Sequence, residues 1–336
     1  MNILNLDNDM FVPAFKQAGH TVLTAGHRRH LNIVISHPVN ALELYKRVCT
    51  DSFVPDVVFY CDSSNIPYFL RIEELPCASL FYSIDTYCHF WHYSYGHAFD
   101  HVFVAQKDHL ALMQKETCAS WLPLFAMSAS PKNDFASRDI PVAFAGTLDP
   151  KTIPHRKVFL TNFRLHHPLY VTDKPFAHIY PRTQIVLNQT AMQEVNMRCF
   201  EAMAHGAALL MEECEGHGIL DLFAPAHNTL PLYRPGDFTH AVEIARHALA
   251  NPDWLAEIAA NGHALVHARH LASHRAATVL ALMENLLHTK AYEVRLNELE
   301  KRKRGVSTSY YMLYDDAVKA GMADYAKVFF AIASKS

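Results

Sequence analysis

The chain lacks the features that mark several large classes of protein. It has no excess of basic residues, because 30 lysines and arginines stand against 33 aspartates and glutamates, for a formal net charge of −3. This balance disfavours a nucleic-acid-binding protein, which is normally basic. No apolar run approaches about 18 residues, so no transmembrane segment is predicted. The basic cluster Lys301–Arg304 leaves peripheral contact with a membrane open, although a solvated helix end is the simpler interpretation.

Neither a disulfide framework nor a leader sequence is expected. The seven cysteines include no Cys-x-x-Cys pair, and their odd number is typical of reduced thiols rather than of a disulfide framework. The first ten residues, MNILNLDNDM, have no basic segment before an apolar run and are typical of a strand. We therefore expect a cytoplasmic protein. Its 336 residues suffice for two domains of about 100–200 residues each.

The first part of the chain alternates short apolar runs with helical segments. Strands are predicted at residues 2–6, 20–25, 32–36, 57–61, 78–84 and 101–105, and an amphipathic helix at 39–50. Alternating strands and helices with short connections predict a parallel sheet covered on both faces. Such a sheet binds ligands beyond the carboxyl ends of its strands.

A polar segment divides this part from a second α/β region. We predict an N-terminal Rossmann-like domain at 1–130, a linker at 131–139, a second domain at 140–288 and a C-terminal helical extension at 289–336. After residue 232 the pattern is helical, with helices expected at 238–250, 252–261 and 264–288. Two such α/β domains imply a cleft between them, where small molecules commonly bind.

The segment NQTAMQEVNMRCFEAMAHGAALLMEE, residues 188–213, is the most informative part of the sequence. Asn196 is a favourable N-cap, Arg198 falls in the first turn of the predicted helix and Glu201 one turn later. Gly206 ends the helix, and an apolar strand follows. A helix N-terminus with an arginine favours an anion such as a diphosphate, and a carboxylate can accept hydrogen bonds from sugar hydroxyls. The pattern indicates a site for a nucleotide diphosphate.

These residues resemble a known family. The pattern Asn196-x-Arg198-x-Phe200-Glu201-Ala202-x-Ala204-x-Gly206 is similar to that of GT-B glycosyltransferases of the spore-maturation (CgeB-like) type. Further motifs agree in order, over roughly residues 100–285: Trp121-Leu122-Pro123, the strand and turn at 142–146, Tyr180-Pro181 before the strand at 184–188, and a tail ending at His274-Arg275. The resemblance implies a GT-B fold, with two Rossmann-like domains facing across a cleft.

The resemblance also implies donor-binding residues in the second domain. Glu201 matches the second glutamate of an E-x7-E pattern and would bind the ribose, while Arg198 would neutralise the diphosphate. Gln193 stands where the family has the first glutamate, and Glu194 is adjacent. Lys151 and Arg156 fit either phosphate cations or solvated surface charges. The complete predicted donor set is Gly146, Lys151, Gln193, Glu194, Asn196, Met197, Arg198 and Glu201.

The acceptor is expected to bind in the first domain. Asp85 follows a predicted strand, and the segment after it is crowded with histidines and aromatic residues that suit sugar binding. The predicted catalytic residues are Asp85, His89 and His97, any of which could remove the proton of the acceptor hydroxyl. A buried polar cluster that holds a loop is the alternative for each histidine.

No metal or cofactor is predicted. His263, His267, His270 and His274 share one helix face, but no carboxylate or cysteine lies in register to complete a zinc site. Asp7-Asn8-Asp9 has the D-x-D form of a metal–nucleotide site, yet its place after the first strand favours a turn or loop.

The predicted function is metal-independent transfer of a sugar from a nucleotide-diphosphate sugar to a hydroxyl of a glycan, protein or small molecule. The resemblance slightly favours retention at the anomeric carbon; Asp85 is the candidate base if the configuration inverts. Two alternatives stay open: a nucleotide-sugar epimerase, and a non-catalytic protein that binds a nucleotide sugar or a glycan. The missing first glutamate favours the second of these.

Overall fold

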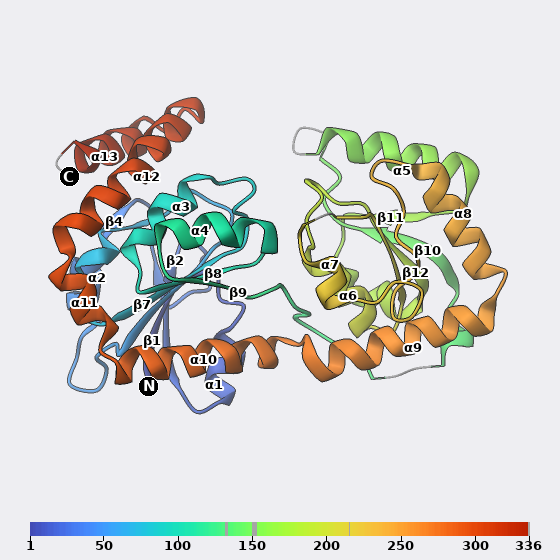
Figure 1. The fold of residues 1–336 in the computed structure, drawn as a ribbon, viewed down its shortest axis with the longest axis horizontal. Coiled ribbons are helices and arrows are strands. Elements are labelled where there is room, and N and C mark those ends of the chain that lie inside the picture. Colours follow the sequence, from blue (N-terminus) through green and yellow to red (C-terminus); the bar gives the residue numbers. More distant parts are fainter. Residues whose placement is uncertain (132–133, 150–152, 215, 335–336) are drawn as a thin grey trace. The chain divides into compact units, whose positions relative to one another are not determined.

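The computed structural model describes residues 1–131, 134–149, 153–214 and 216–334 (Figure 1). The chain forms two compact units, one of Met1–Pro123 with Ala276–Ser336 and one of Leu124–Arg275. The first border thus precedes the predicted linker at 131–139. The second border falls inside helix α10 (Ala272–His288) rather than at residue 288.

Unit 1 is built on a seven-stranded sheet in the order β3-β2-β1-β5-β7-β8-β9, and every neighbouring pair is parallel. Its strands are β1 (Asn2–Asp7), β2 (Thr21–Gly26), β3 (Ile33–Val34), β5 (Val57–Cys61), β7 (Ala78–Ser83), β8 (His101–Val104) and β9 (Ala119–Trp121). The strand order reverses between β1 and β5, so the switch point at which open α/β sheets bind ligands lies at their carboxyl ends.

Short helices and a two-stranded sheet complete the first part of unit 1. They are α1 (Val12–Gln17), α2 (Ala41–Val48), α3 (Trp91–Tyr95), α4 (Leu110–Glu116), the 3₁₀ turns η1 (Ile72–Glu74), η2 (Gly96–Ala98) and η3 (Lys107–His109), and the paired strands β4 (Val39–Asn40) and β6 (Phe69–Leu70). Helix α2 begins at Asn40, whose side chain accepts hydrogen bonds from the Leu42 and Glu43 amides. The predicted helix at 39–50 is therefore confirmed within two residues at each end.

The C-terminal helices belong to unit 1. They are α11 (Ala291–Asn297), α12 (Leu299–Lys319) and α13 (Ala323–Ala333), and Figure 1 shows them, in orange-red to red, beside the first 123 residues. Tyr310 and Leu313 of α12 are buried in the same apolar cluster as Trp91 and Tyr95 of α3. The segment predicted as an extension is thus part of the core of the first unit.

Unit 2 contains a four-stranded parallel sheet in the order β11-β10-β12-β13. Its elements are β10 (Ile140–Ala145), β11 (Tyr170–Thr172), β12 (Thr183–Asn188), β13 (Ala208–Met211), α5 (Pro154–His166), α6 (Met197–Ala204), α7 (Ile219–Leu222), α8 (Phe238–Leu249), α9 (Pro252–Arg269) and the 3₁₀ turns η4 (Phe135–Ser137), η5 (Phe176–His178) and η6 (Tyr180–Arg182). The predicted α/β architecture with two parallel sheets is confirmed.

One predicted helix break is wrong. The sequence indicated separate helices at 252–261 and 264–288, but α9 continues through Gly262 to Arg269. Gly262 lies inside the helix because of packing: a Cβ there would stand 2.7 Å from the Asn228 carbonyl oxygen and 3.0 Å from the Met203 sulfur. Over the described residues, no helix is both long enough and apolar enough to cross a membrane.

Candidate functional site

The predicted donor residues gather at the carboxyl edge of the unit 2 sheet. Gly146 follows β10, Asn188 ends β12, and α6 begins at the same edge because the loop from β12 leads directly into it. Asn196 occupies the N-cap with extended backbone, as predicted, but its side chain makes no capping hydrogen bond. Instead the Asn196 and Asn188 amides exchange two hydrogen bonds of 3.2 Å. The side chain that usually caps the helix start is therefore used to join it to the sheet.

Arg198 lies across the end of β10. Its Nε donates to the Ala145 carbonyl oxygen at 2.8 Å and its Nη1 to Asn188 Oδ1 at 2.6 Å. The guanidinium also stands 4.5 Å from the centre of the Phe144 ring, a cation–π contact. Because these three contacts fix the group while the residue stays half-buried, Arg198 presents a positioned charge at this edge.

Because Gly146 has no side chain, it leaves the space that the Arg198 guanidinium occupies. A Cβ built on Gly146 would lie 2.2 Å from Arg198 Nη2, far inside van der Waals contact. A side chain at position 146 would therefore displace the guanidinium. This close approach explains the glycine after β10 better than a turn conformation does, since its φ is not positive.

Glu201 lies one turn deeper in α6, and only 8% of its surface is exposed. Burial raises the pKa of its carboxyl to about 7, and the charge of Arg198 acts in the opposite direction. Tyr180, whose hydroxyl is hydrogen-bonded to Arg198, lies beside the same carboxyl. The structure thus brings Gly146, Arg198 and Glu201 together, as the sequence predicted.

Gln193 and Glu194 lie next to each other in the loop before α6, but their side chains are in different environments. The buried Glu194 carboxylate accepts hydrogen bonds from the Ala191 amide at 3.1 Å, the Met192 amide at 2.6 Å and Asn196 Nδ2 at 3.1 Å. Gln193 is exposed and adopts a left-handed φ of 60°. Glu194 therefore holds the loop, whereas Gln193 is its accessible tip. Met197, also predicted here, is half-buried in the first turn of α6.

Arg156 is not the solvated surface charge that was one of its two interpretations. It is buried, its Nε and Nη2 donate to the side chain and carbonyl of Gln189, and its Nη1 donates to the Thr147 carbonyl. Burial lowers the pKa of this guanidinium to about 10. Arg156 thus ties the loops after β10 and β12 together and is not a solvated charge. The predicted Lys151 lies outside the described residues.

Sequence reasoning missed Glu212 in this unit. Its buried carboxylate accepts from the Thr190 amide and hydroxyl, at 3.1 and 2.5 Å, and from the Gly236 amide at 2.9 Å. Its position directly after β13, at the same sheet edge, was the available signal. Glu212 and Glu194 between them fix both ends of the loop that carries Gln193.

In unit 1, three aspartates mark the carboxyl edge of neighbouring strands. Asp7 ends β1, Asp62 follows β5 and Asp85 follows β7. Asp62 Oδ2 accepts from the Ile84 and Asp85 amides at 3.1 and 2.9 Å, so it positions Asp85. The Asp85 carboxylate in turn accepts hydrogen bonds from the Ser64 and Tyr87 hydroxyls.

The predicted histidines lie in different places. His89 is half-buried in the turn after Asp85, and its ring centre is 5.5 Å from that of His92. His97 lies in η2, which precedes β8 and so falls at the amino edge of the sheet. There it contacts Glu116 at 3.0 Å and packs against Gly305 of α12. The structure therefore brings His89 near Asp85 but not His97.

Asp7 makes a contact that the sequence did not indicate. Its Oδ1 lies 2.7 Å from Nδ1 of His27, and its Oδ2 accepts from the Ser63 hydroxyl at 2.5 Å. Burial raises the pKa of Asp7, against the opposing effects of these two partners. Asp9 pairs separately with His30 and Arg28, at 2.9 and 3.3 Å. The two aspartates of the D-x-D segment therefore contact different partners at the strand end, His27 for Asp7 and His30 with Arg28 for Asp9.

Of the four histidines predicted to share one helix face, only His263 and His267 lie in α9, because that helix ends at Arg269; His270 is its C-cap and His274 lies in α10. Nε2 of His263 lies 3.0 Å from the Ser130 carbonyl oxygen and Nε2 of His267 lies 3.2 Å from that of Ala204. Nδ1 of His270 contacts Arg275. Within the described part of the chain, no group of three histidine, cysteine, aspartate or glutamate side chains is arranged to hold a metal ion.

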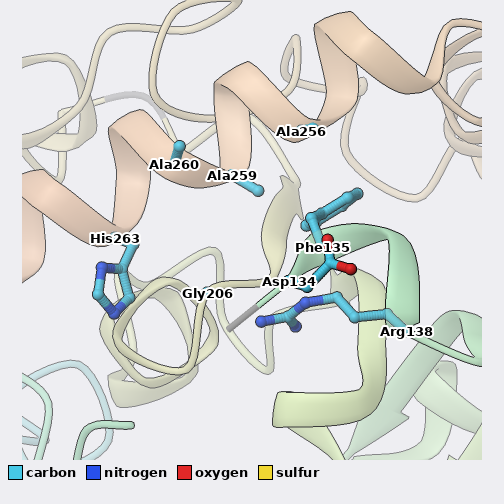
Figure 2. A pocket seen from close by; sticks show the side chains of 8 residues that line it. All are labelled: Asp134, Phe135, Arg138, Gly206, Ala256, Ala259, Ala260 and His263. Atoms are coloured by element: carbon cyan, nitrogen blue, oxygen red, sulfur yellow. The ribbon is translucent and has the colours of Figure 1, made fainter. Parts of the chain in front are cut away.

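A cavity of about 250 Å³ lies elsewhere in unit 2 (Figure 2). Gly206, at the end of α6, and Arg138, before β10, place it at the amino edge of the sheet, opposite the predicted site. Figure 2 shows its lining: Asp134, Phe135 and Arg138 before β10, Gly206, and Ala256, Ala259, Ala260 and His263 of α9. Arg138 donates there to the carbonyls of Tyr180, Thr183 and His205, which makes it a structural residue.

Comparison with known proteins gives a match to one family model and to several solved structures. Residues 135–281 match a family model described as glycosyl transferase-like. Among solved structures, sucrose-phosphate synthase from Thermosynechococcus elongatus is similar, with 12% identity over 86% of this chain and 100% of the other and a TM-score of 0.63. A glycosyltransferase from Rickettsia africae has 11% identity over 85% and 98%, with a TM-score of 0.61.

A third similar structure is Anabaena HepE in complex with UDP-glucose. It has 11% identity over 84% of this chain and 99% of the other, with a TM-score of 0.57. The search of curated proteins gave no match. At these identities the solved structures show the fold alone, and the family model covers 147 of the 336 residues, less than half of the chain. The chain therefore has the GT-B fold of glycosyltransferases, and its residues 135–281 are similar to the glycosyl transferase-like family.

Proposed function

We propose that the protein transfers a sugar from a UDP-sugar to an acceptor hydroxyl. The observation that carries the proposal is the positioned guanidinium of Arg198 against Gly146, one turn from the buried Glu201. A fixed cation at a helix N-terminus suits the two phosphates. UDP is proposed as the nucleotide because the similar Anabaena protein is described in complex with UDP-glucose.

Each donor residue then has a specific role. Arg198 and the N–H groups at the start of α6 bind the diphosphate, and their interaction strengthens as negative charge develops on the leaving group. Glu201 accepts hydrogen bonds from the ribose hydroxyls. Gln193, at the tip of the loop held by Glu194 and Glu212, contacts the transferred sugar. Lys151 stays a predicted phosphate ligand.

The acceptor is proposed to bind at the carboxyl edge of unit 1. Asp85, held by Asp62, and the nearby His89 would hydrogen-bond its hydroxyls. Substitution of Asp85 by asparagine should reduce turnover strongly while UDP binding is preserved. The geometry gives no such role to His97. Metal independence, the choice between retention and inversion, and the chemical class of the acceptor stay predictions.

The direct experiment is a thermal-shift screen with UDP-, GDP-, ADP- and dTDP-sugars, followed by product analysis with the stabilising donor. A ligand that binds the native state raises the melting temperature by mass action. We expect UDP-sugars to stabilise the protein and a glycosylated product to form. Isomerised sugar without an acceptor would instead indicate an epimerase, and binding without turnover over an acceptor panel would indicate a binding protein.

A further inference from the structure

One face of helix α12 is exposed although it carries apolar side chains. The opposite face of the helix is buried in the core of unit 1 through Val306, Tyr310 and Leu313. Tyr311 and Val318, in contrast, are 48% and 51% exposed. Residues seven positions apart lie on the same side of a helix, so these two side chains form an apolar seam along the outside of α12.

An aromatic pair widens this seam toward α13, which lies beside α12 (Figure 1). The rings of Tyr314 in α12 and Phe330 in α13 have centres 5.5 Å apart, and both side chains are exposed. Exposed apolar side chains that cluster, rather than occur singly, mark an interaction surface. We call the surface formed by Tyr311, Tyr314, Val318 and Phe330 the α12 face.

Four exposed charged residues border the α12 face, and their signs alternate along the helix. In chain order they are Glu300, Arg304, Asp315 and Lys319. Steps of four or seven residues connect all of them to Tyr311, so they share its side of the helix. Asp315 pairs with Lys319 within α12, whereas Arg304 has no acidic partner among the residues that the structure describes. Surface pairs of this kind are weak and can exchange partners.

A second copy of α12 in the antiparallel direction matches this charge order. When two such helices cross at the level of residues 309–310, residue 304 of each copy faces residue 315 of the other, and residue 300 faces residue 319. Both contacts join opposite charges, whereas a parallel copy in register would bring like charges together. Tyr311 then lies over the smaller Thr308 of the other copy. The sequence of α12 is therefore complementary to itself in one direction only.

We propose that the α12 face binds a second copy of this chain as a two-fold symmetric, antiparallel helix pair. Both copies use the same surface, as in a closed dimer. An anionic membrane fits this face less well, because the face carries two acidic and two basic side chains. A single helix pair is small beside a standard protein interface, so the dimer is weak and depends on concentration. This proposal is independent of the function proposed above.

The test is sedimentation velocity over a wide range of protein concentration, with the melting temperature measured on each variant. We expect the wild type to dimerise and Tyr311→Ala to weaken the dimer about tenfold, since tyrosines at the centre of an interface contribute strongly. Arg304→Glu and Asp315→Arg should each weaken it at least about tenfold, because each places like charges together. A mixture of these two variants should associate as the wild type does, because the introduced glutamate then faces the introduced arginine.

Lys16→Glu is the matched control, because it makes the charge change of Arg304→Glu at an exposed position of α1, also in unit 1. It should leave the association unchanged. A wild type that stays monomeric, a dimer that neither charge reversal weakens, or single variants that stay apart when mixed would overturn the proposal. So would a monomer that sediments with vesicles of anionic phospholipid, because that result would assign the α12 face to a membrane.

Discussion

Arg198 occupies the space that a side chain at Gly146 would fill, with its Nη2 2.2 Å from the position of a Cβ. The contact joins the end of β10 to the first turn of α6, two segments that the sequence marked independently as donor-binding. This one contact explains why glycine is needed at position 146 and how the arginine at position 198 is held in place. Because the Arg198 side chain can move without unpacking the core, we expect a change in this contact to affect ligand binding more than folding.

Gly146→Ala should therefore weaken donor binding more than it affects stability. The φ of Gly146 is not positive, so alanine adds no backbone strain, and the flexible guanidinium can shift. We expect UDP affinity to fall about tenfold, the equivalent of about 1.4 kcal/mol, with a small change in melting temperature. In an Arg198→Ala background the same substitution should change affinity little. A full additional loss there would show that Gly146 acts on the ligand by another route.

Glu201→Ala should reduce sugar transfer strongly and leave the chain folded. The ribose contact contributes to donor binding and to placement of the diphosphate, so kcat/KM should fall by about a hundredfold or more. Circular dichroism and melting temperature check the fold. A variant with wild-type rates would remove Glu201 from the site.

The raised pKa of Glu201 predicts that the free energy of unfolding depends on pH. Its folded pKa of about 7 lies above the ordinary value of 4.5, so between these values the folded state holds the proton more tightly than the unfolded state. Its contribution to stability is therefore present at low pH and is lost as pH rises through about 7. Compared with Glu201→Gln, the wild type should lose about 3 kcal/mol of unfolding free energy between pH 4 and 8. Parallel curves for the two proteins would show that this carboxyl is not desolvated.

Arg295 should be essential to the stability of unit 1. Its Nε pairs with the buried Asp100 at 2.9 Å, and its other nitrogens donate to the carbonyls of residues 72, 73, 75 and 77. Arg295→Met leaves a buried charge and several carbonyls without their partner, which should cost about 3–5 kcal/mol in denaturant unfolding. Lys290→Ala, which removes the exposed pair with Glu293, should cost less than about 1 kcal/mol. Equal effects would mean that the C-terminal helices contribute little to this unit.

The sequence predicted the elements better than their contacts. The strands and α6 follow from apolar runs, an N-cap and a terminal glycine, which are local signals. The Asp7–His27 pair depends on the register of β1 with β2, and the contacts of Arg295 join segments far apart in the chain. Glu194 and Gln193 are adjacent, so only coordinates distinguish the loop-holding carboxylate from the exposed tip. Local pattern carries no information about such pairings.

Titration calorimetry of UDP with wild type, Arg198→Ala and Arg182→Ala tests the central claim most directly. Arg182 is the control because it is exposed and pairs with Asp139 at the amino edge of the same sheet. We predict that UDP binds wild type and Arg182→Ala equally and binds Arg198→Ala at least about tenfold more weakly, since charge-assisted hydrogen bonds are lost. Equal affinity in all three proteins, or no binding to any, would contradict a donor site at the start of α6.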